Sequence, residues 1–328
     1  MNDPRSARDD EPFDVKLQVG SLWESTVLRT RQAIESGVLS LTPMDLVVVE
    51  RDGIGYLVRM LPGRDPKAEA GKTANSKPES ERVDPFLPYD EDFFVADVTD
   101  THVCLLNKFT VVKHHLLIVT NEFVDQRTTL TLADFVATAA CMAKIDGLVF
   151  YNAGSAAGAS QRHRHMQIVP LLLAETGPPA PIEAAFGSDD GRSAGKTLPA
   201  FSFRHAFERL NLDPSADPLT TARALYGCYL SMLEAVGLHV ADEVESDAEL
   251  GPYKLLVTRR WMFVVPRRRE AFAGIQVNAL GFAGSLLARG REQLATIGQI
   301  GPMGILNGVA VPALSALRRE NSFVGDRR

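Results

Sequence analysis

Residues 148–173 read LVFYNAGSAAGASQRHRHMQIVPLLL, and this stretch sets the fold of the middle of the chain. One apolar run lies at 148–151 and a second ends at 173, and a loop of small residues at 152–160 lies between them. Short apolar runs bounded by Gly and Ser are typical of β-strands. We therefore expect one strand at 148–151, then a tight loop, and then a second strand from about 163 to 173.

The second predicted strand carries polar residues that can do chemistry. Alternate residues of a strand face the same side of the sheet. His163, His165 and Gln167 are therefore expected on one face, and Arg164 and Met166 on the other. Two imidazoles and an amide on one face can contact a phosphate group, and a neutral imidazole can attack phosphorus to form a covalent intermediate. The spacing of the histidines alone leaves two alternatives open, a metal site or two histidines satisfied by hydrogen bonds.

The loop before this strand is suited to an anion. Its glycines let the backbone approach a ligand closely, and Asn152 and Ser160 can donate hydrogen bonds. The loop and the strand together predict a phosphate-binding site.

The composition limits the function classes. The chain has 328 residues, with 35 Lys and Arg against 41 Asp and Glu, for a formal charge of -6. A nucleic-acid-binding domain usually has a basic surplus, and this chain has none. Its three cysteines form no CxxC pair, which favours free thiols in a reducing compartment. We find no apolar run long enough for a membrane span and no signal sequence, and we expect a cytoplasmic protein that binds neither membrane nor nucleic acid.

The rest of the chain predicts an α+β fold with a mainly antiparallel sheet and helices packed over it. We expect a flexible tail at 1–12, an N-terminal region at 13–180 that contains the histidine motif, a linker at 181–200, and a C-terminal region at 201–328 that completes the cleft. Helices are predicted at 21–36, 131–145, 221–236 and 281–288. Further strands are predicted at 45–50, 55–60, 94–98, 103–106, 116–119, 254–257 and 261–265, with a long surface loop at 62–85.

One longer motif spans the loop and the second strand: Asn152-x-Gly154-x-x-x-Gly158-x-Ser160-x-x-His163-x-His165-x-Gln167. It resembles the active-site motif of the histidine-triad (HIT-like) superfamily, in the branch of the diadenosine tetraphosphate (Ap4A) phosphorylases, or ATP adenylyltransferases, and the galactose-1-phosphate uridylyltransferases. The segments 84–88 (DPFLP), 105–123 (LLNKFTVVKHHLLIVTNEF) and 253–284 are similar to the phosphorylases. Uridylyltransferases commonly carry Pro between the two histidines, whereas this chain has Arg164.

The resemblance implies a role for each matching residue. His165 is expected to be the nucleophile that takes an adenylyl group, and His163 its supporting partner. Gln167, Asn152, Gly158 and Ser160 are expected to hold phosphate oxygens, Asn107 to contact the ribose, and Lys67 in the 62–85 loop to contact phosphates.

Other polar residues are less decisive. Lys254 is equally suited to a phosphate ligand and to a charge at a strand edge. Of the neighbouring His114 and His115, we expect one to be packed or to cap an element and the other to be exposed.

The implied function is phosphorolysis of Ap4A to ADP and ATP, reversibly, through an adenylyl-histidine. A divalent cation, Mg²⁺ above all, is expected to accompany the polyphosphate, and no protein metal site is predicted. Three alternatives stay open: a related nucleotidyltransferase that uses a sugar phosphate or sulfate, a dinucleoside polyphosphate hydrolase, and a non-catalytic Ap4A sensor. The sequence does not predict the oligomeric state.

Overall fold

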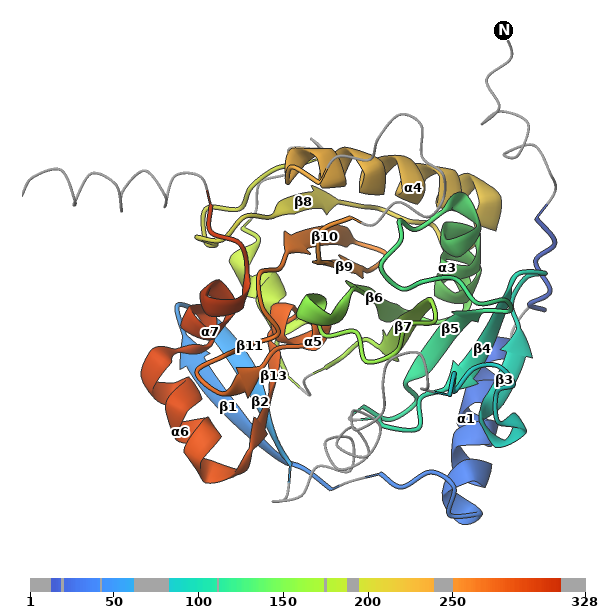
Figure 1. The fold of residues 1–328 in the computed structure, drawn as a ribbon, viewed down its shortest axis with the longest axis horizontal. Coiled ribbons are helices and arrows are strands. Elements are labelled where there is room, and N and C mark those ends of the chain that lie inside the picture. Colours follow the sequence, from blue (N-terminus) through green and yellow to red (C-terminus); the bar gives the residue numbers. More distant parts are fainter. Residues whose placement is uncertain are drawn as a thin grey trace, which may run out of the picture.

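The computed structural model describes residues 13–18, 21–41, 43–61, 83–110, 112–173, 176–187, 195–238 and 250–313 (Figure 1). The predicted tail at 1–12, the end of the chain from 314 and Lys67 lie outside these residues. The helices are α1 (Ser21–Glu35), α3 (Leu132–Lys144), α4 (Pro218–Ala235), α5 (Ala279–Phe282), α6 (Gly290–Ile300) and α7 (Pro302–Val309), with short 3-10 turns η2 (Glu91–Phe93), η3 (Ser155–Ala157) and η4 (Pro181–Ala185). No helix within the described ranges is long and apolar enough to cross a membrane.

One eight-stranded sheet forms the centre of the molecule. Its order is β3-β4-β5-β7-β6-β9-β10-β8, and every neighbouring pair is antiparallel. The predicted α+β class with a mainly antiparallel sheet is confirmed. The strands are β3 (Phe94–Asp97), β4 (His102–Leu106), β5 (Leu116–Thr120), β6 (Gly147–Ala153), β7 (His165–Pro170), β8 (Ala206–Arg209), β9 (Tyr253–Val257) and β10 (Trp261–Pro266). Because β6 pairs with β9, the sheet is shared by the regions on both sides of the predicted linker.

Two smaller sheets complete the fold. In one, β2 (Ile54–Leu61) lies between β1 (Asp45–Arg51), to which it is antiparallel, and β13 (Ser285–Arg289), to which it is parallel. The other is a hairpin of β11 (Ala271–Phe272) and β12 (Ile275–Gln276). The first small sheet and helices α6 and α7 lie together at one side of the molecule (Figure 1).

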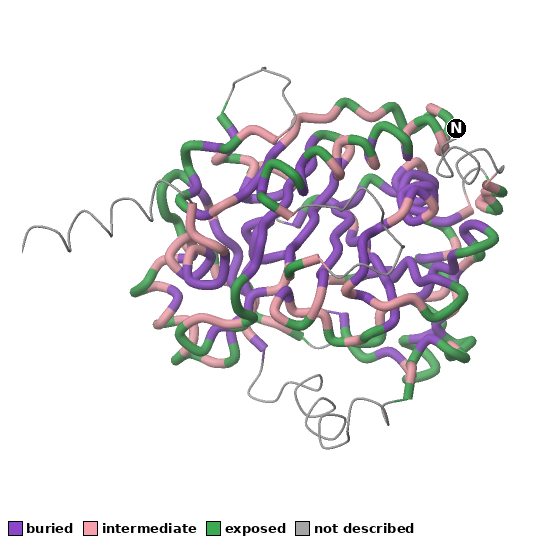
Figure 2. The backbone as a smooth tube through the Cα atoms, turned by 45° about the horizontal axis from the view of Figure 1, so that its top comes forward, coloured by how far each residue is buried: buried purple, intermediate pink, exposed green. Residues whose placement is uncertain are grey.

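The two faces of the central sheet are buried by different layers, as the alternation along β6 shows. Val149 and Tyr151 pack in a core cluster with residues of α1, α3 and α4. Leu148 and Phe150 pack in a second cluster with residues of β2, β13, α5 and α7. The buried strands therefore run through the centre of the molecule, where Figure 2 shows the buried segments.

Helix α3 begins where the sequence predicts. The Asp134 carboxylate accepts the Thr131 backbone N–H at 2.7 Å, which satisfies a donor at the N-terminus of the helix.

The predicted helix at 281–288 is wrong. Gly284 has φ +93°, which ends the short helix α5, and residues 285–289 pair with β2 instead.

The second predicted strand is shorter than expected. β7 begins at His165 and ends at Pro170, and Leu172 has a positive φ of 75°. His163 lies just outside β7 and pairs with Asp125 in an isolated bridge. Residues of the predicted linker also pack closely where they are described, since Ile182, Phe186 and Leu198 are buried in the second core cluster.

Candidate active site

The site lies where β6 and β7 stop pairing. Their antiparallel ladder ends at the pair Phe150–Gln167. Beyond it, β6 continues beside β9 as far as Ala153, and β7 continues beside β5 as far as His165. The polar residues of the motif gather around this point.

His165 is fixed by its own backbone. Its Nδ1 lies 2.8 Å from the carbonyl oxygen of His163, and its side chain is only 5% exposed. A carbonyl oxygen can only accept, so Nδ1 carries the hydrogen and Nε2 carries the lone pair. This tautomer is the one that a nucleophilic Nε2 requires. The ring of Phe86 packs against the imidazole at 5.4 Å.

His163 supports His165 through that carbonyl, while its ring nitrogens are engaged elsewhere. Nδ1 lies 2.7 Å from the carboxylate of Asp84, and Nε2 lies 2.8 Å from the carbonyl oxygen of Thr120. Nε2 also lies 2.9 Å from the hydroxyl oxygen of Thr120. His163 therefore connects the segment around Asp84 to β5.

A relay of hydrogen bonds orients Gln167. Its Oε1 accepts from His115 Nε2 at 3.0 Å, and the amide nitrogen of Asn107 lies 3.3 Å from His115 Nδ1. This arrangement leaves the NH₂ group of Gln167 as the donor for another acceptor. Asn107 is thus coupled to Gln167 through His115, which is buried, whereas His114 is half-buried and bonds to Thr30 at 3.0 Å.

Lys254 ties the glycine loop to the sheet. It is fully buried on β9, and its Nζ donates to Asn152 Oδ1 at 2.6 Å and to the carbonyl oxygen of Ala157. Gly158 follows with φ +85°, and a Cβ there would lie 3.7 Å from Lys254 Nζ. The distance alone would admit a side chain, so it is the positive φ of this turn that favours Gly at 158. Ser160 is exposed on the same loop.

A buried ion pair lies just before β7, on the side opposite His165. The Arg164 guanidinium lies 3.0 Å from Asp134 Oδ2, and His102 lies 3.1 Å from Asp134 Oδ1. Burial alone raises the pKa of Asp134, but the charge of Arg164 and the bond to His102 outweigh it and hold the pKa at about 2. This pair anchors the strand of His165 to helix α3.

The structure thus brings together most of the residues that the sequence predicts. His163, His165, Gln167, Asn152, Gly158 and Lys254 lie around the end of the β6–β7 ladder, Asn107 joins them through His115, and Ser160 lies on the loop. Sequence reasoning missed Asp84 as the partner of His163, the place of His115 in the relay, and Gln126, whose side chain bonds to the His165 backbone. Asp84 lies in a segment that matches the family. Gln126 lies in a turn-rich stretch with no pattern that points to the site.

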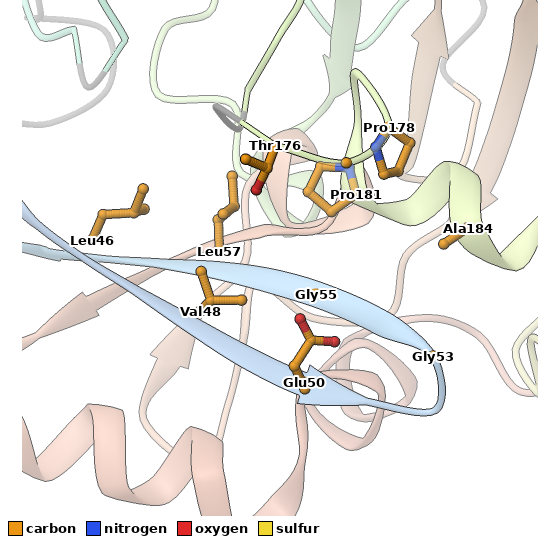
Figure 3. A pocket seen from close by; sticks show the side chains of 11 residues that line it. Leu46, Val48, Glu50, Gly53, Gly55, Leu57, Thr176, Pro178, Pro181 and Ala184 are labelled. Atoms are coloured by element: carbon orange, nitrogen blue, oxygen red, sulfur yellow. The ribbon is translucent and has the colours of Figure 1, made fainter.

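A surface groove lies elsewhere. It has a volume of about 380 Å³ and lies over β1 and β2 beside the turn at 176–184 (Figure 3). Leu46, Val48 and Leu57 line it together with the single carboxylate of Glu50, and none of the motif residues does. An apolar groove with one negative charge is not suited to a polyphosphate.

Comparison with known proteins identifies the family. The model of the Ap4A phosphorylase N-terminal domain matches residues 12–188, and the model of the ATP adenylyltransferase C-terminal domain matches residues 199–312. Diadenosine 5',5'''-P1,P4-tetraphosphate phosphorylase 2 of Saccharomyces cerevisiae is 30% identical over 262 residues, which cover 74% of this chain and 78% of the yeast protein. Protein APA1 of the same yeast is 29% identical over 254 residues, with the same two shares.

Solved structures agree on the fold. Yeast Ap4A phosphorylase Apa2 in complex with AMP has a TM-score of 0.72 at 24% identity, over 90% of this chain and 98% of that one. The complex of Apa2 with Ap4A has a TM-score of 0.70 at 23% identity, over 92% and 99%. The two family models together match nearly the whole described chain, and the chain belongs to the Ap4A phosphorylase and ATP adenylyltransferase family.

Proposed function

We propose that this protein is an Ap4A phosphorylase, which converts Ap4A and phosphate to ADP and ATP, reversibly, through an adenylyl group on His165. The observation that carries the proposal is the bond from His165 Nδ1 to the carbonyl oxygen of His163, since it places the lone pair on Nε2. The matched family models and the yeast phosphorylase support the choice of substrate.

The reaction has two displacements. Nε2 of His165 attacks the α-phosphorus of Ap4A, the bond from that phosphorus to its bridging oxygen breaks, and ATP leaves. An oxygen of inorganic phosphate then attacks the same phosphorus, the bond to Nε2 breaks, and ADP leaves. The first step forms one P–N bond and the second breaks it, so the enzyme returns to its starting state.

We propose that the NH₂ group of Gln167 stabilises the negative charge on the phosphoryl oxygens, and that the ammonium group of Lys254, bonded to Asn152, adds positive charge behind the site. Lys254 is fully buried and Gln167 is oriented by His115. Fixed donors in a poorly solvated site stabilise developing charge more than the same groups in water.

Gln167 also favours phosphate as the acceptor. A histidine at this position could transfer a proton to or from water, whereas an amide cannot do so in the useful pH range. Phosphate is already anionic and needs no base, while water does. Phosphorolysis is therefore chemically favoured over hydrolysis.

We further propose that a divalent cation such as Mg²⁺ enters with the polyphosphate and neutralises part of its charge. Lys67 is proposed as a phosphate ligand on the resemblance alone. A cytoplasmic location is proposed because Cys104 and Cys141 are buried free thiols, which suit a reducing compartment.

The test is a product analysis. The protein is incubated with Mg²⁺ and Ap4A, with and without phosphate, and the nucleotides are separated. ADP and ATP formed only with phosphate support the proposal. AMP formed without phosphate would identify a hydrolase. Turnover only with sulfate or a sugar phosphate would identify a related transferase, and binding without turnover would identify a sensor.

Two histidine variants make this test specific. His165→Asn removes the nucleophile, and His205→Asn changes an equally buried histidine in the second core. Loss of an acid-labile adenylyl-protein in the first variant and its retention in the second are expected. An adenylyl group that still forms on His165→Asn would overturn the role of His165.

A further inference from the structure

The gap between β6 and β7 is filled by a side chain. In the same register the ladder would continue with Tyr151–Met166 and then Asn152–His165, but neither pair forms. The amide of Gln126 occupies the place. Its Oε1 accepts the His165 backbone N–H at 2.7 Å, and its Nε2 lies 3.0 Å from the Asn152 carbonyl and 3.2 Å from the His165 carbonyl.

Gln126 is itself held rigidly. Its backbone N–H donates to the Arg162 carbonyl at 2.6 Å, and the Tyr151 hydroxyl donates to its carbonyl oxygen at 2.5 Å. Its side chain is 1% exposed. Beside it, the Arg164 N–H donates to the Val124 carbonyl at 2.7 Å, so that residues 124–126 run along 162–164 like a short strand.

A carboxamide is the group that this gap requires. One backbone N–H needs an acceptor and two backbone carbonyls need donors, and a single amide supplies both kinds. Glu would keep the acceptor but set its charge against two carbonyl oxygens. Leu would leave all three buried backbone groups without their partner, which is costly.

We propose that Gln126 is a positioning residue that keeps β6 and β7 apart at the nucleophile. Antiparallel strands that lie this close otherwise continue to pair, and pairing of Asn152 with His165 would close the point where the motif residues gather. Because Gln126 sets the spacing of the two backbones, it fixes the position of the His165 ring relative to the Asn152 side-chain amide. It acts through the backbone and touches neither reacting atom.

The kinetic test rests on the proposed function and compares Gln126→Leu and Gln126→Glu with Thr138→Val. Thr138 lies behind the other face of β7, where its hydroxyl bonds to the Asp134 carbonyl and the Met166 sulfur, so its loss loosens the core without contact to His165. Both Gln126 variants are expected to lose about 10²-fold in kcat with little change in KM for Ap4A, because a small misplacement of a reacting group costs that much. Thr138→Val is expected to keep the kcat of the wild type.

Two measurements need no activity. In protein with ¹⁵N-labelled histidine, the Nδ1 and Nε2 signals of His165 should shift in both Gln126 variants and stay unchanged in Thr138→Val. In the wild type, the His165 backbone amide should be strongly protected from hydrogen exchange, because Gln126 Oε1 accepts it.

The outcomes separate the two proposals. A wild type that does not cleave Ap4A defeats the proposed function, while the ¹⁵N and exchange measurements still decide the role of Gln126. Folded Gln126 variants with wild-type kcat and unchanged His165 signals would overturn that role. So would an unprotected His165 amide in the wild type, a result that does not depend on any variant folding.

Discussion

Two buried histidines, His165 and His205, have the same local anchor and different surroundings. In each, Nδ1 donates at 2.8 Å to the carbonyl oxygen of the residue two positions earlier, His163 or Phe203. The two side chains are 5% and 3% exposed, so burial does not distinguish them. Each ring is therefore held in the tautomer with its lone pair on Nε2.

The surroundings decide what each ring does. The Leu198 backbone N–H donates to His205 Nε2 at 2.6 Å, and the rings of Phe201 and Phe263 pack around the imidazole. His205 is a structural histidine whose lone pair is used by the fold. His165 lies at the end of a strand ladder beside Gln126, where charged and amide side chains gather. A histidine motif is thus judged by its neighbours.

The largest expected effect separates the two histidines at the proposed nucleophile, His165. His165→Asn should reduce the rate of phosphorolysis by about 10⁴-fold or more, because removing a nucleophile leaves only binding and charge stabilisation. His205→Asn should keep kcat per folded molecule. Steady-state rates on protein verified by circular dichroism decide this. Equal losses in the two variants would mean that His165, like His205, serves the fold.

The next effect concerns the opposite face of the strand that carries His165. Asp134→Ala leaves the buried Arg164 charge without its carboxylate, and about 3–5 kcal/mol of the free energy of unfolding should be lost. Urea unfolding gives the value, and Thr138→Val, with a loss of about 1 kcal/mol, is the control for a lost hydrogen bond. An unchanged midpoint would show that the pair does not anchor β7 to α3.

A smaller effect is expected at the relay. Gln167→Leu removes the donor that His115 orients, and kcat should fall about 10²-fold, comparable to the loss of one donor to a developing oxyanion. His114→Ala, at the neighbouring position outside the relay, should have little effect on kcat. The ratio of the two rates measures how much of the effect is specific to the relay.

The smallest effect is the response of His205 to pH. Burial lowers the pKa of His205, against a smaller upward effect of the bond to Phe203. Between the folded pKa and about 6.5, the unfolded chain binds more protons than the folded one, so stability should fall as the pH falls below about 6.5. Urea unfolding at pH 7.5, 6.5 and 5.5 measures the slope, which should be shallower in His205→Asn. The same slope in both proteins would contradict the assignment.

The sequence determined the elements that depend on local pattern. Helix α3, with its cap at Thr131, and most strands of the central sheet begin and end within a few residues of the prediction. Periodicity and capping act over a few residues and can be seen in the chain itself. The prediction of a helix at 281–288 was wrong because residues 285–289 pair with β2, which lies more than 220 positions earlier in the sequence.

The residues proposed for the chemistry, His163, His165 and Gln167, lie on one short motif, so the sequence alone predicts them. Only the tertiary structure decided how they are used. Asp84 bonds to the His163 ring from 79 positions away, and His115 bonds to the Gln167 amide from 52 positions away. Gln126 bonds to the His165 backbone from 39 positions away. The physical reason is that hydrogen-bond partners are set by where strands begin and stop pairing. That geometry belongs to the whole sheet, and no short stretch of sequence contains it.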